Sequence, residues 1–277
     1  MNVTIVHLSQ TGNTKKVAQR MAETLEGAGH AVRLVPLRGA RAEDLQRADL
    51  VGVGAPVWAS QAPAPVRAFL AAAPSLGGRR AFVFATSGGA PGKVLTDLAE
   101  PLRRAGADVV GGAVVRGECF YPAPCIVGRY PGRPNAADLD EAERFVASVE
   151  RHVGAGVAGP LPDTRPEALR PKLDFYSVAA RMMTDAVIRR TMPVPRVDVA
   201  RCKICKTCVA ACPVGCIERE PAPRVGEACV RCYHCMVLCP QKALSVDWAV
   251  PNAILWSVYN ETFERWLGDV RPGEAIY

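Results

Sequence analysis

Two copies of one cysteine pattern near the C-terminus constrain this chain more than any other feature. Each copy reads Cys-x2-Cys-x2-Cys-x3-Cys-Pro; the first run spans Cys202–Pro213 and the second spans Cys229–Pro240. Two-residue gaps wrap a backbone around a compact metal centre, so that three thiolates reach it from one loop while N–H groups point at its sulfurs. The proline after the fourth cysteine fixes the direction in which the chain leaves.

The spacing resembles that of bacterial ferredoxins, in which the fourth cysteine of each run binds the cluster held by the other run. The resemblance implies two [4Fe–4S] clusters. Cluster one would be bound by Cys202, Cys205, Cys208 and Cys239, and cluster two by Cys229, Cys232, Cys235 and Cys212. Zinc is the alternative, but a structural zinc site usually takes two cysteine pairs separated by a loop, which this repeated group of four does not suit.

Several residues beside the runs have two interpretations. Cys216 follows the first run and is expected to pack beside a cluster, with a substitute ligand as the alternative. His234 lies between two ligands, where it would either donate toward the cluster sulfurs or face solvent. Lys203, Lys206 and Arg231 also flank ligands and would offset the negative charge of the clusters.

Residues 1–153 read as alternating strands and helices. Strands are expected at 3–8, 31–37, 50–56, 81–86 and 109–115, and helices at 13–28, 66–72, 94–104 and 138–153. The strands are short apolar runs, as expected when helices cover both faces of a sheet. This order predicts an α/β doubly wound sheet of five parallel strands.

A polar loop follows the first strand and leads into a helix. Its residues are Ser9, Gln10, Thr11, Gly12, Asn13 and Thr14. The N–H groups of a helix N-terminus favour an anion, and hydroxyls can bond phosphate oxygens. Because the loop lacks both the P-loop lysine and the G-x-G-x-x-G pattern, a monophosphate is the expected ligand.

The loop resembles the FMN phosphate loop of flavodoxins, [ST]-x-T-G-x-T, at Ser9, Thr11, Gly12 and Thr14. The resemblance implies a flavodoxin-like fold with FMN at the switch point between the first and third strands. The other flavin loops would then be Pro56, Val57, Trp58 and Ala59, with Trp58 stacked on the ring, and Thr86, Ser87, Gly88 and Gly89. Flavodoxins often have a second aromatic residue in the latter loop. None occurs here, so the open face would be exposed or covered by residues such as 119–122 or Tyr130. A flavodoxin-like domain without flavin is the alternative.

Composition divides the rest of the chain. Residues 154–192 contain a Pro- and Gly-rich linker and one connecting helix, predicted at 172–190. Residues 193–247 form the small α+β ferredoxin domain implied by the resemblance. Residues 248–277 are an aromatic-rich extension, with Trp256, Tyr259, Phe263 and Trp266 near helical spacing. Cys119 and Cys125 match neither motif and are expected to be free thiols, with a redox dithiol as the alternative.

The formal charge of +7 does not by itself indicate nucleic acid. Two clusters and a flavin phosphate together carry about −6, which brings the holoprotein close to neutral. The sequence has no apolar stretch long enough to span a membrane. Eleven cysteines without a recognisable export signal predict a reducing, cytoplasmic location in which cysteines bind metal.

As a whole, the chain resembles flavodoxin–ferredoxin fusion proteins. The resemblance implies single-electron transfer between FMN, two clusters and redox partner proteins, with a homodimer left open. A flavin-dependent reductase acting on a quinone or another small acceptor is the first alternative, although no acid–base pair in the flavin loops indicates it. A redox sensor is the second.

Overall fold

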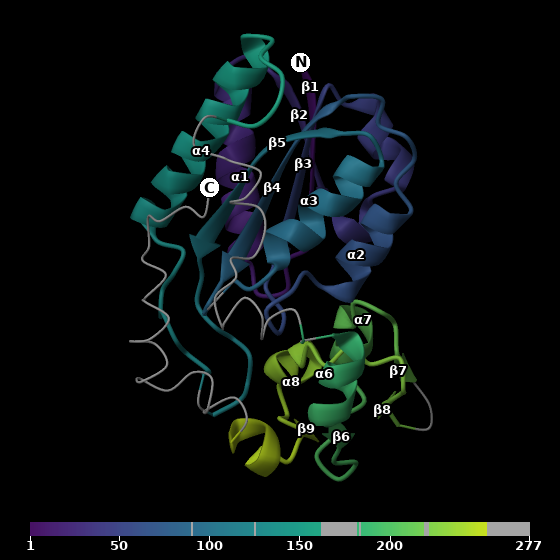
Figure 1. Ribbon diagram of the computed structural model, residues 1–277. Helices are drawn as coiled ribbons and strands as arrows, with labels where there is room; N and C mark the ends of the chain where they lie inside the picture. Colours follow the sequence, from purple (N-terminus) through teal and green to yellow (C-terminus); the bar gives the residue numbers. More distant parts are fainter. Residues whose placement is uncertain (90, 125, 162–181, 183, 219–221, 254–277) are drawn as a thin grey trace. The chain divides into compact units, whose positions relative to one another are not determined.

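The computed structural model describes residues 1–89, 91–124, 126–161, 182, 184–218 and 222–253 (Figure 1). These residues fall into two compact units. The described part of the first unit is 1–89, 91–118, 130–161 and 182, and that of the second is 119–124, 126–129, 184–218 and 222–253. Residues 119–129 therefore group with the second unit although the chain on either side of them belongs to the first. The predicted domain boundaries stay predictions.

Five parallel strands form the sheet of the first unit. They are β1 (Asn2–His7), β2 (Ala31–Pro36), β3 (Leu50–Pro56), β4 (Arg80–Ser87) and β5 (Asp108–Arg116), in the order β2-β1-β3-β4-β5. The central strands β3 and β4 are buried along nearly their whole length, as their continuous apolar runs require. The predicted five-stranded, doubly wound parallel sheet is confirmed.

Helices cover both faces of this sheet (Figure 1). One face packs against α1 (Asn13–Gly27) and α4 (Ala136–Gly154), and the other against α2 (Ala64–Ala71) and α3 (Val94–Arg104). Each face has its own apolar core, centred on Phe82 and Phe84 beneath α1 and α4 and on Val83 and Ala85 beneath α2 and α3. Two short 3-10 helices, η1 (Leu37–Gly39) and η2 (Ala42–Arg47), fill the connection from β2 to β3 and were not predicted.

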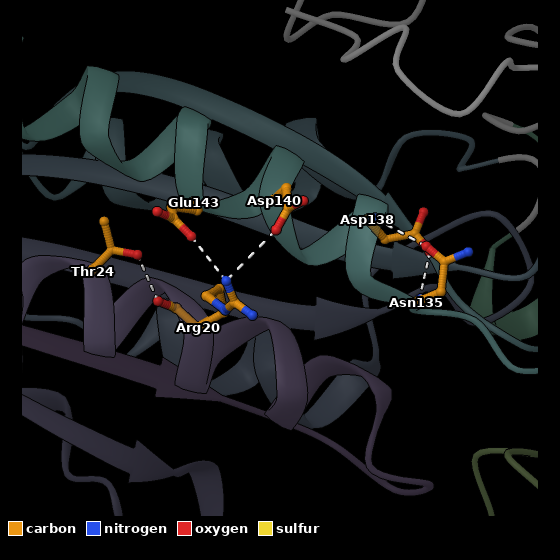
Figure 2. Close-up of polar contacts among 6 residues, drawn as sticks. All are labelled: Arg20, Thr24, Asn135, Asp138, Asp140 and Glu143. Carbon is orange, nitrogen blue, oxygen red and sulfur yellow. Dashed lines mark hydrogen bonds and ion pairs between the residues drawn. The ribbon is translucent and has the colours of Figure 1, made fainter.

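Polar contacts join α1 to α4 and fix the start of α4 (Figure 2). The Arg20 guanidinium lies 2.9 Å from a Glu143 carboxylate oxygen and 3.7 Å from one of Asp140. The Asn135 side chain accepts a hydrogen bond from the Asp138 N–H, and the Asp138 carboxylate accepts one from the Asn135 N–H. This reciprocal capping satisfies N–H groups that would otherwise lack partners at the helix start.

The second unit is built from short elements. They are α6 (Asp185–Thr191), β6 (Arg196–Val197), α7 (Thr207–Ala211), β7 (Ile217–Glu218), β8 (Arg224–Val225), α8 (His234–Leu238) and β9 (Leu244–Ser245). Strand β6 pairs antiparallel with β9, and β7 pairs antiparallel with β8. Helices α7 and α8 occupy equivalent places, since each begins within a cysteine run and ends just before its fourth cysteine.

The prediction of one continuous helix over 172–190 is wrong in the part that the structure describes. Helix α6 begins at Asp185, and Thr184 before it has an extended backbone. The Thr184 hydroxyl accepts a hydrogen bond from the Val187 N–H at 3.3 Å, so it caps a new helix instead of continuing an earlier one. Residues 172–181, Met183 and the aromatic stripe from Trp256 to Trp266 lie outside the described residues. None of the helices in the described ranges is long and apolar enough to cross a bilayer.

Candidate functional site

The loops predicted to bind a ligand follow three neighbouring strands of the sheet. Residues 8–12 follow β1, 57–63 follow β3, and 88–93 follow β4. The chain continues from β1 to β2 on one side and from β3 to β4 and β5 on the other, which makes the β1/β3 boundary a topological switch point. In doubly wound sheets ligands bind beyond the carboxyl ends of the strands at such a boundary.

The loop after β1 contains buried polar atoms without partners. Ser9 Oγ and Gln10 Nε2 are both buried and form no hydrogen bond within the described part of the chain. Gly12, with φ at +99°, precedes α1, whose first turn has neither a side-chain cap nor an acidic residue. Since buried polar groups normally have partners, and a bare helix N-terminus attracts anions, these atoms suit a bound phosphate.

The first two residues of α1 hold the loop after β1 in place. The hydroxyl oxygens of Thr14 and Thr86 lie 2.8 Å apart in a buried contact, which ties the start of α1 to the end of β4. Asn13 Nδ2 donates to the Glu118 carbonyl at 3.0 Å and ties the loop to the chain after β5. The predicted loop residues therefore divide into those with free polar atoms and those that position the loop.

His7, at the end of β1, was not predicted. Its side chain is 4% exposed, and its Nδ1 has no hydrogen-bond partner among the described residues. Burial, with a smaller contribution from Lys15, lowers the pKa of His7, so the imidazole stays neutral at pH 7. His7 could have been noticed in the sequence, because it is a titratable residue that ends a mainly apolar strand just before the polar loop.

The loop after β3 forms a tight turn around Trp58. The backbones of Trp58 and Gln61 exchange two hydrogen bonds, of 3.0 and 3.1 Å, across Ala59 and Ser60. Both central residues have positive φ, 46° and 63°, which non-glycine residues rarely adopt. The turn holds Trp58 half-buried beside the switch point, where the sequence predicts a ring-stacking residue.

The loops after β3 and β4 are packed directly on one another. The Lys93 N–H donates to the Ser60 carbonyl at 2.8 Å. Gly92 has φ of +57°, and a Cβ there would lie 2.1 Å from the Ser60 carbonyl oxygen. Asp97, in the first turn of α3, accepts a hydrogen bond from the Ala62 N–H at 3.0 Å. These contacts make the two loops one wall of the candidate site.

A buried arginine supports the loop after β4. Arg116 ends β5 and is only 7% exposed; its guanidinium donates to the Gly89 carbonyl at 2.8 Å and lies 4.4 Å from the centre of the Tyr130 ring. Ser87 Oγ donates to the same carbonyl at 2.7 Å. Arg116 was not predicted, although a single cation at the end of an apolar strand is a recognisable signal. Its charge adds to the attraction of this edge for an anion.

The eight cysteines of the two runs line two pockets in the second unit. The first pocket is lined by Cys202, Cys205, Cys208 and Cys239 together with Lys203 and Lys206, and the second by Cys229, Cys232, Cys235, Cys212 and Cys216. Their empty volumes are similar, about 360 and 300 Å³. In each pocket one cysteine comes from the other run. The donor set therefore fits two cofactors of one kind, each held by four thiolates.

In the described ranges, no group of three or more His, Cys, Asp or Glu side chains is placed to hold a single metal ion. A [4Fe–4S] cluster distributes its four thiolates over four iron atoms. Cys216, in the second pocket, has its Sγ 3.5 Å from that of Cys212, and its place beside a cluster stays a prediction.

The two pockets differ in their surroundings. Cys205 of the first pocket is exposed, and the Thr207 hydroxyl, 3.4 Å from its Sγ, lowers the pKa of the Cys205 thiol. In the second pocket Cys229 and Cys235 are 7% and 9% exposed, and burial raises the pKa of the Cys235 thiol to about 12. A metal that binds there must displace the proton of a thiol that is otherwise fully protonated at pH 7.

Three aromatic rings pack beside the second pocket. Tyr233, which lines this pocket and is 1% exposed, makes edge-on contacts with Tyr121 and Trp248 at centroid distances of 5.2 and 5.1 Å. The Tyr121 and Trp248 rings are 6.0 Å apart, so the three form a closed cluster. The rings exclude water from this side of the pocket.

Arg231, Tyr233 and His234, which lie between ligands of the second run, are buried. The Arg231 guanidinium donates to the carbonyls of Met192, Cys229 and Arg189, so it fixes the backbone of the run instead of lying at the surface. His234 is 7% exposed, which rules out the interpretation of it as a solvent-facing residue. Cys119 is a half-buried free thiol, and Cys125 lies outside the described residues.

Known proteins resemble part of the chain. Residues 4–124 match a family model described as a flavodoxin domain. A flavodoxin from the domain Archaea is 20% identical in sequence, with a TM-score of 0.45; the match covers 56% of this chain and 99% of the archaeal chain. Flavodoxin 1 from Bacillus cereus is 19% identical, with a TM-score of 0.43; the match covers 55% of this chain and 99% of the Bacillus chain. Rubredoxin:oxygen oxidoreductase from Desulfovibrio gigas is 21% identical, with a TM-score of 0.44; the match covers 56% of this chain and 36% of the Desulfovibrio chain. No curated protein matches the chain.

The strand order and the switch-point loops define the first unit as a doubly wound α/β domain with a ligand edge beyond β1 and β3. Together with the family match over residues 4–124, they make this N-terminal part a flavodoxin-like domain.

Proposed function

We propose that this chain is an electron carrier whose flavodoxin-like unit binds FMN and whose second unit binds two [4Fe–4S] clusters. The observation that carries the proposal is the division of eight cysteines into two pockets, each with the four ligands that the spacing predicts. FMN exchanges two electrons and can pass them singly, whereas each cluster carries one. The combination suits electron exchange between a donor and an acceptor that transfer different numbers of electrons at a time.

The chain's own residues supply the binding and the positioning. The family match and the unpartnered donors of Ser9 and Gln10 support FMN, with its phosphate at the start of α1. The wall formed by the loops after β3 and β4, which Lys93 joins to Ser60, would orient the ring. In the second unit Arg231 holds the backbone of the second run, and the Tyr233 cluster keeps water from its pocket.

Metal and flavin analysis tests the proposal directly. Protein purified without oxygen should contain about eight irons, eight acid-labile sulfides and one FMN per chain. A zinc content of about one or two per chain, without sulfide, would contradict the cluster proposal. Chemically reduced protein should reduce redox proteins but show no rapid, substrate-saturable turnover with quinones. Such turnover would favour the flavin-dependent reductase instead.

Replacing Ser9 by alanine tests the phosphate position. The change removes a hydroxyl without a protein partner, so we expect FMN affinity to fall about tenfold, as for the loss of one hydrogen bond to a charged group. Riboflavin affinity should not change, because riboflavin lacks the phosphate. Flavin fluorescence titration measures both affinities. Ser148→Ala is the matched control, since the Ser148 hydroxyl bonds the Arg144 carbonyl on α4. Equal losses for FMN and riboflavin would place the phosphate elsewhere.

A further inference from the structure

The two cysteine pockets differ in the charge of their linings. The first pocket is lined by Lys203 and Lys206, whereas the described residues that line the second, apart from its cysteines, are apolar or tyrosine. The two lysines alternate with the ligands Cys202, Cys205 and Cys208, so the spacing of the motif places both cations beside the metal site.

These cations are available to a partner. Lys203 and Lys206 are exposed, as is Lys242, which follows the ligand Cys239 by three residues. None of the three forms an ion pair within the described part of the chain. Arg201 is different, since Asp198 lies 3.5 Å from its guanidinium and offsets its charge. We call Lys203, Lys206 and Lys242 the basic rim.

Exposed apolar side chains accompany the basic rim. Ile204 is 47% exposed and lies between Lys203 and Cys205; Val237 and Leu238 are 41% and 39% exposed and directly precede Cys239. An apolar centre edged by charge is the usual composition of a protein docking surface. Cys205 is exposed, whereas each cysteine of the second pocket is buried or half-buried, and this difference places the surface over the first pocket.

We infer that electrons pass to or from the partner at the first pocket, and that the partner is a redox protein with an acidic docking face, matched to the basic rim. The inference rests on the proposed function, because it requires a cluster in that pocket. One electron passes between the reduced and the oxidised protein, with no bond or proton exchanged. Tyr233 of the aromatic cluster lines the second pocket, and none of that pocket's cysteines is exposed.

Two small acceptors of opposite charge test the inference. Reduced holoprotein is mixed with cobalt(III)–EDTA, an anion, or with hexaamminecobalt(III), a cation, and its reoxidation is followed by stopped flow. In the K203E/K206E variant we expect the rate with the anion to fall about tenfold and the rate with the cation to rise by a similar factor, because charge steering acts oppositely on the two. Added salt should weaken both effects.

The R104E/R144E variant is the matched control. Both arginines are exposed on helices of the flavodoxin-like unit, and the variant changes the net charge equally. Its two rates should stay near those of the unmodified protein. If R104E/R144E changed the two reoxidation rates as much as K203E/K206E does, the inference would be overturned, because the change in net charge alone would then explain the rates of both variants.

Other outcomes separate the remaining explanations. Unchanged rates in K203E/K206E would place electron exchange elsewhere and overturn the inference. In K203E/K206E, the two rates could instead shift in the same direction, with a shifted midpoint potential in a redox titration. That result would mean that the lysines act on the cluster and not on the partner, and it would overturn the inference. The iron and sulfide contents of the unmodified protein are determined before any rate is measured. If both are absent, the proposed function fails, and the inference about the first pocket is not the cause of that failure.

Discussion

Replacing Cys239 by serine is expected to remove the cluster from the pocket formed mainly by the first run. Cys239 belongs to the second run, yet it lines the first pocket with Cys202, Cys205 and Cys208. The iron content should fall from about eight to about four per chain. Cys212→Ser should likewise remove the cluster of the second pocket, which Cys212 shares with the second run. Iron and sulfide analysis measures both.

Pairs of substitutions reveal which cysteines share a cluster. C202S/C239S removes two ligands of one pocket, so it should lose no more iron than C239S alone. C229S/C239S removes one ligand from each pocket, so it should lose nearly all iron. If each run bound its own cluster, the two results would be exchanged. Cys119→Ser is the control, because Cys119 lines neither pocket, and it should keep about eight irons.

The sheet could be predicted from the sequence because each strand is marked locally. Strands β3 and β4 are continuous apolar runs, and the bounds predicted for β3 and α3 agree with the structure. The 3-10 helices between β2 and β3 carry no such periodicity and were missed. The helix predicted over 172–190 failed at Thr184, where a hydroxyl that bonds the backbone starts a new helix.

The candidate site could be predicted only where its residues are close in sequence. Ser9 to Thr14 are consecutive residues of one loop and the start of α1, and each cysteine run is a local motif. The contact of Arg116 with Gly89, and that of Gly92 with Ser60, join segments from different strands. Their formation depends on the register of β3, β4 and β5, which no local pattern encodes. The same holds for Tyr121, whose ring contacts Tyr233 more than a hundred residues away in the sequence.

The contact between Gly92 and Ser60 leads to a second large expected effect. An alanine Cβ at position 92 would lie 2.1 Å from the Ser60 carbonyl oxygen, and φ at this position is +57°. The loops after β3 and β4 must therefore separate in G92A. Strain from the positive φ and from the overlap together amount to about 3 kcal/mol, so we expect FMN affinity to fall about a hundredfold.

Gly27→Ala is the control for this substitution. Gly27 ends α1 without a positive φ, and nothing lies within 4 Å of a Cβ there, so alanine should leave FMN affinity unchanged and raise stability by about 0.5–1 kcal/mol. Fluorescence titration gives the affinities, and hydrogen exchange at the Lys93 N–H, which donates to Ser60 at 2.8 Å, reports whether the loops have separated. Faster exchange at Lys93 with undiminished FMN binding would show that this wall of the site does not contact the flavin. Unchanged exchange and unchanged affinity would mean that the close contact at Gly92 is relieved without moving the loops.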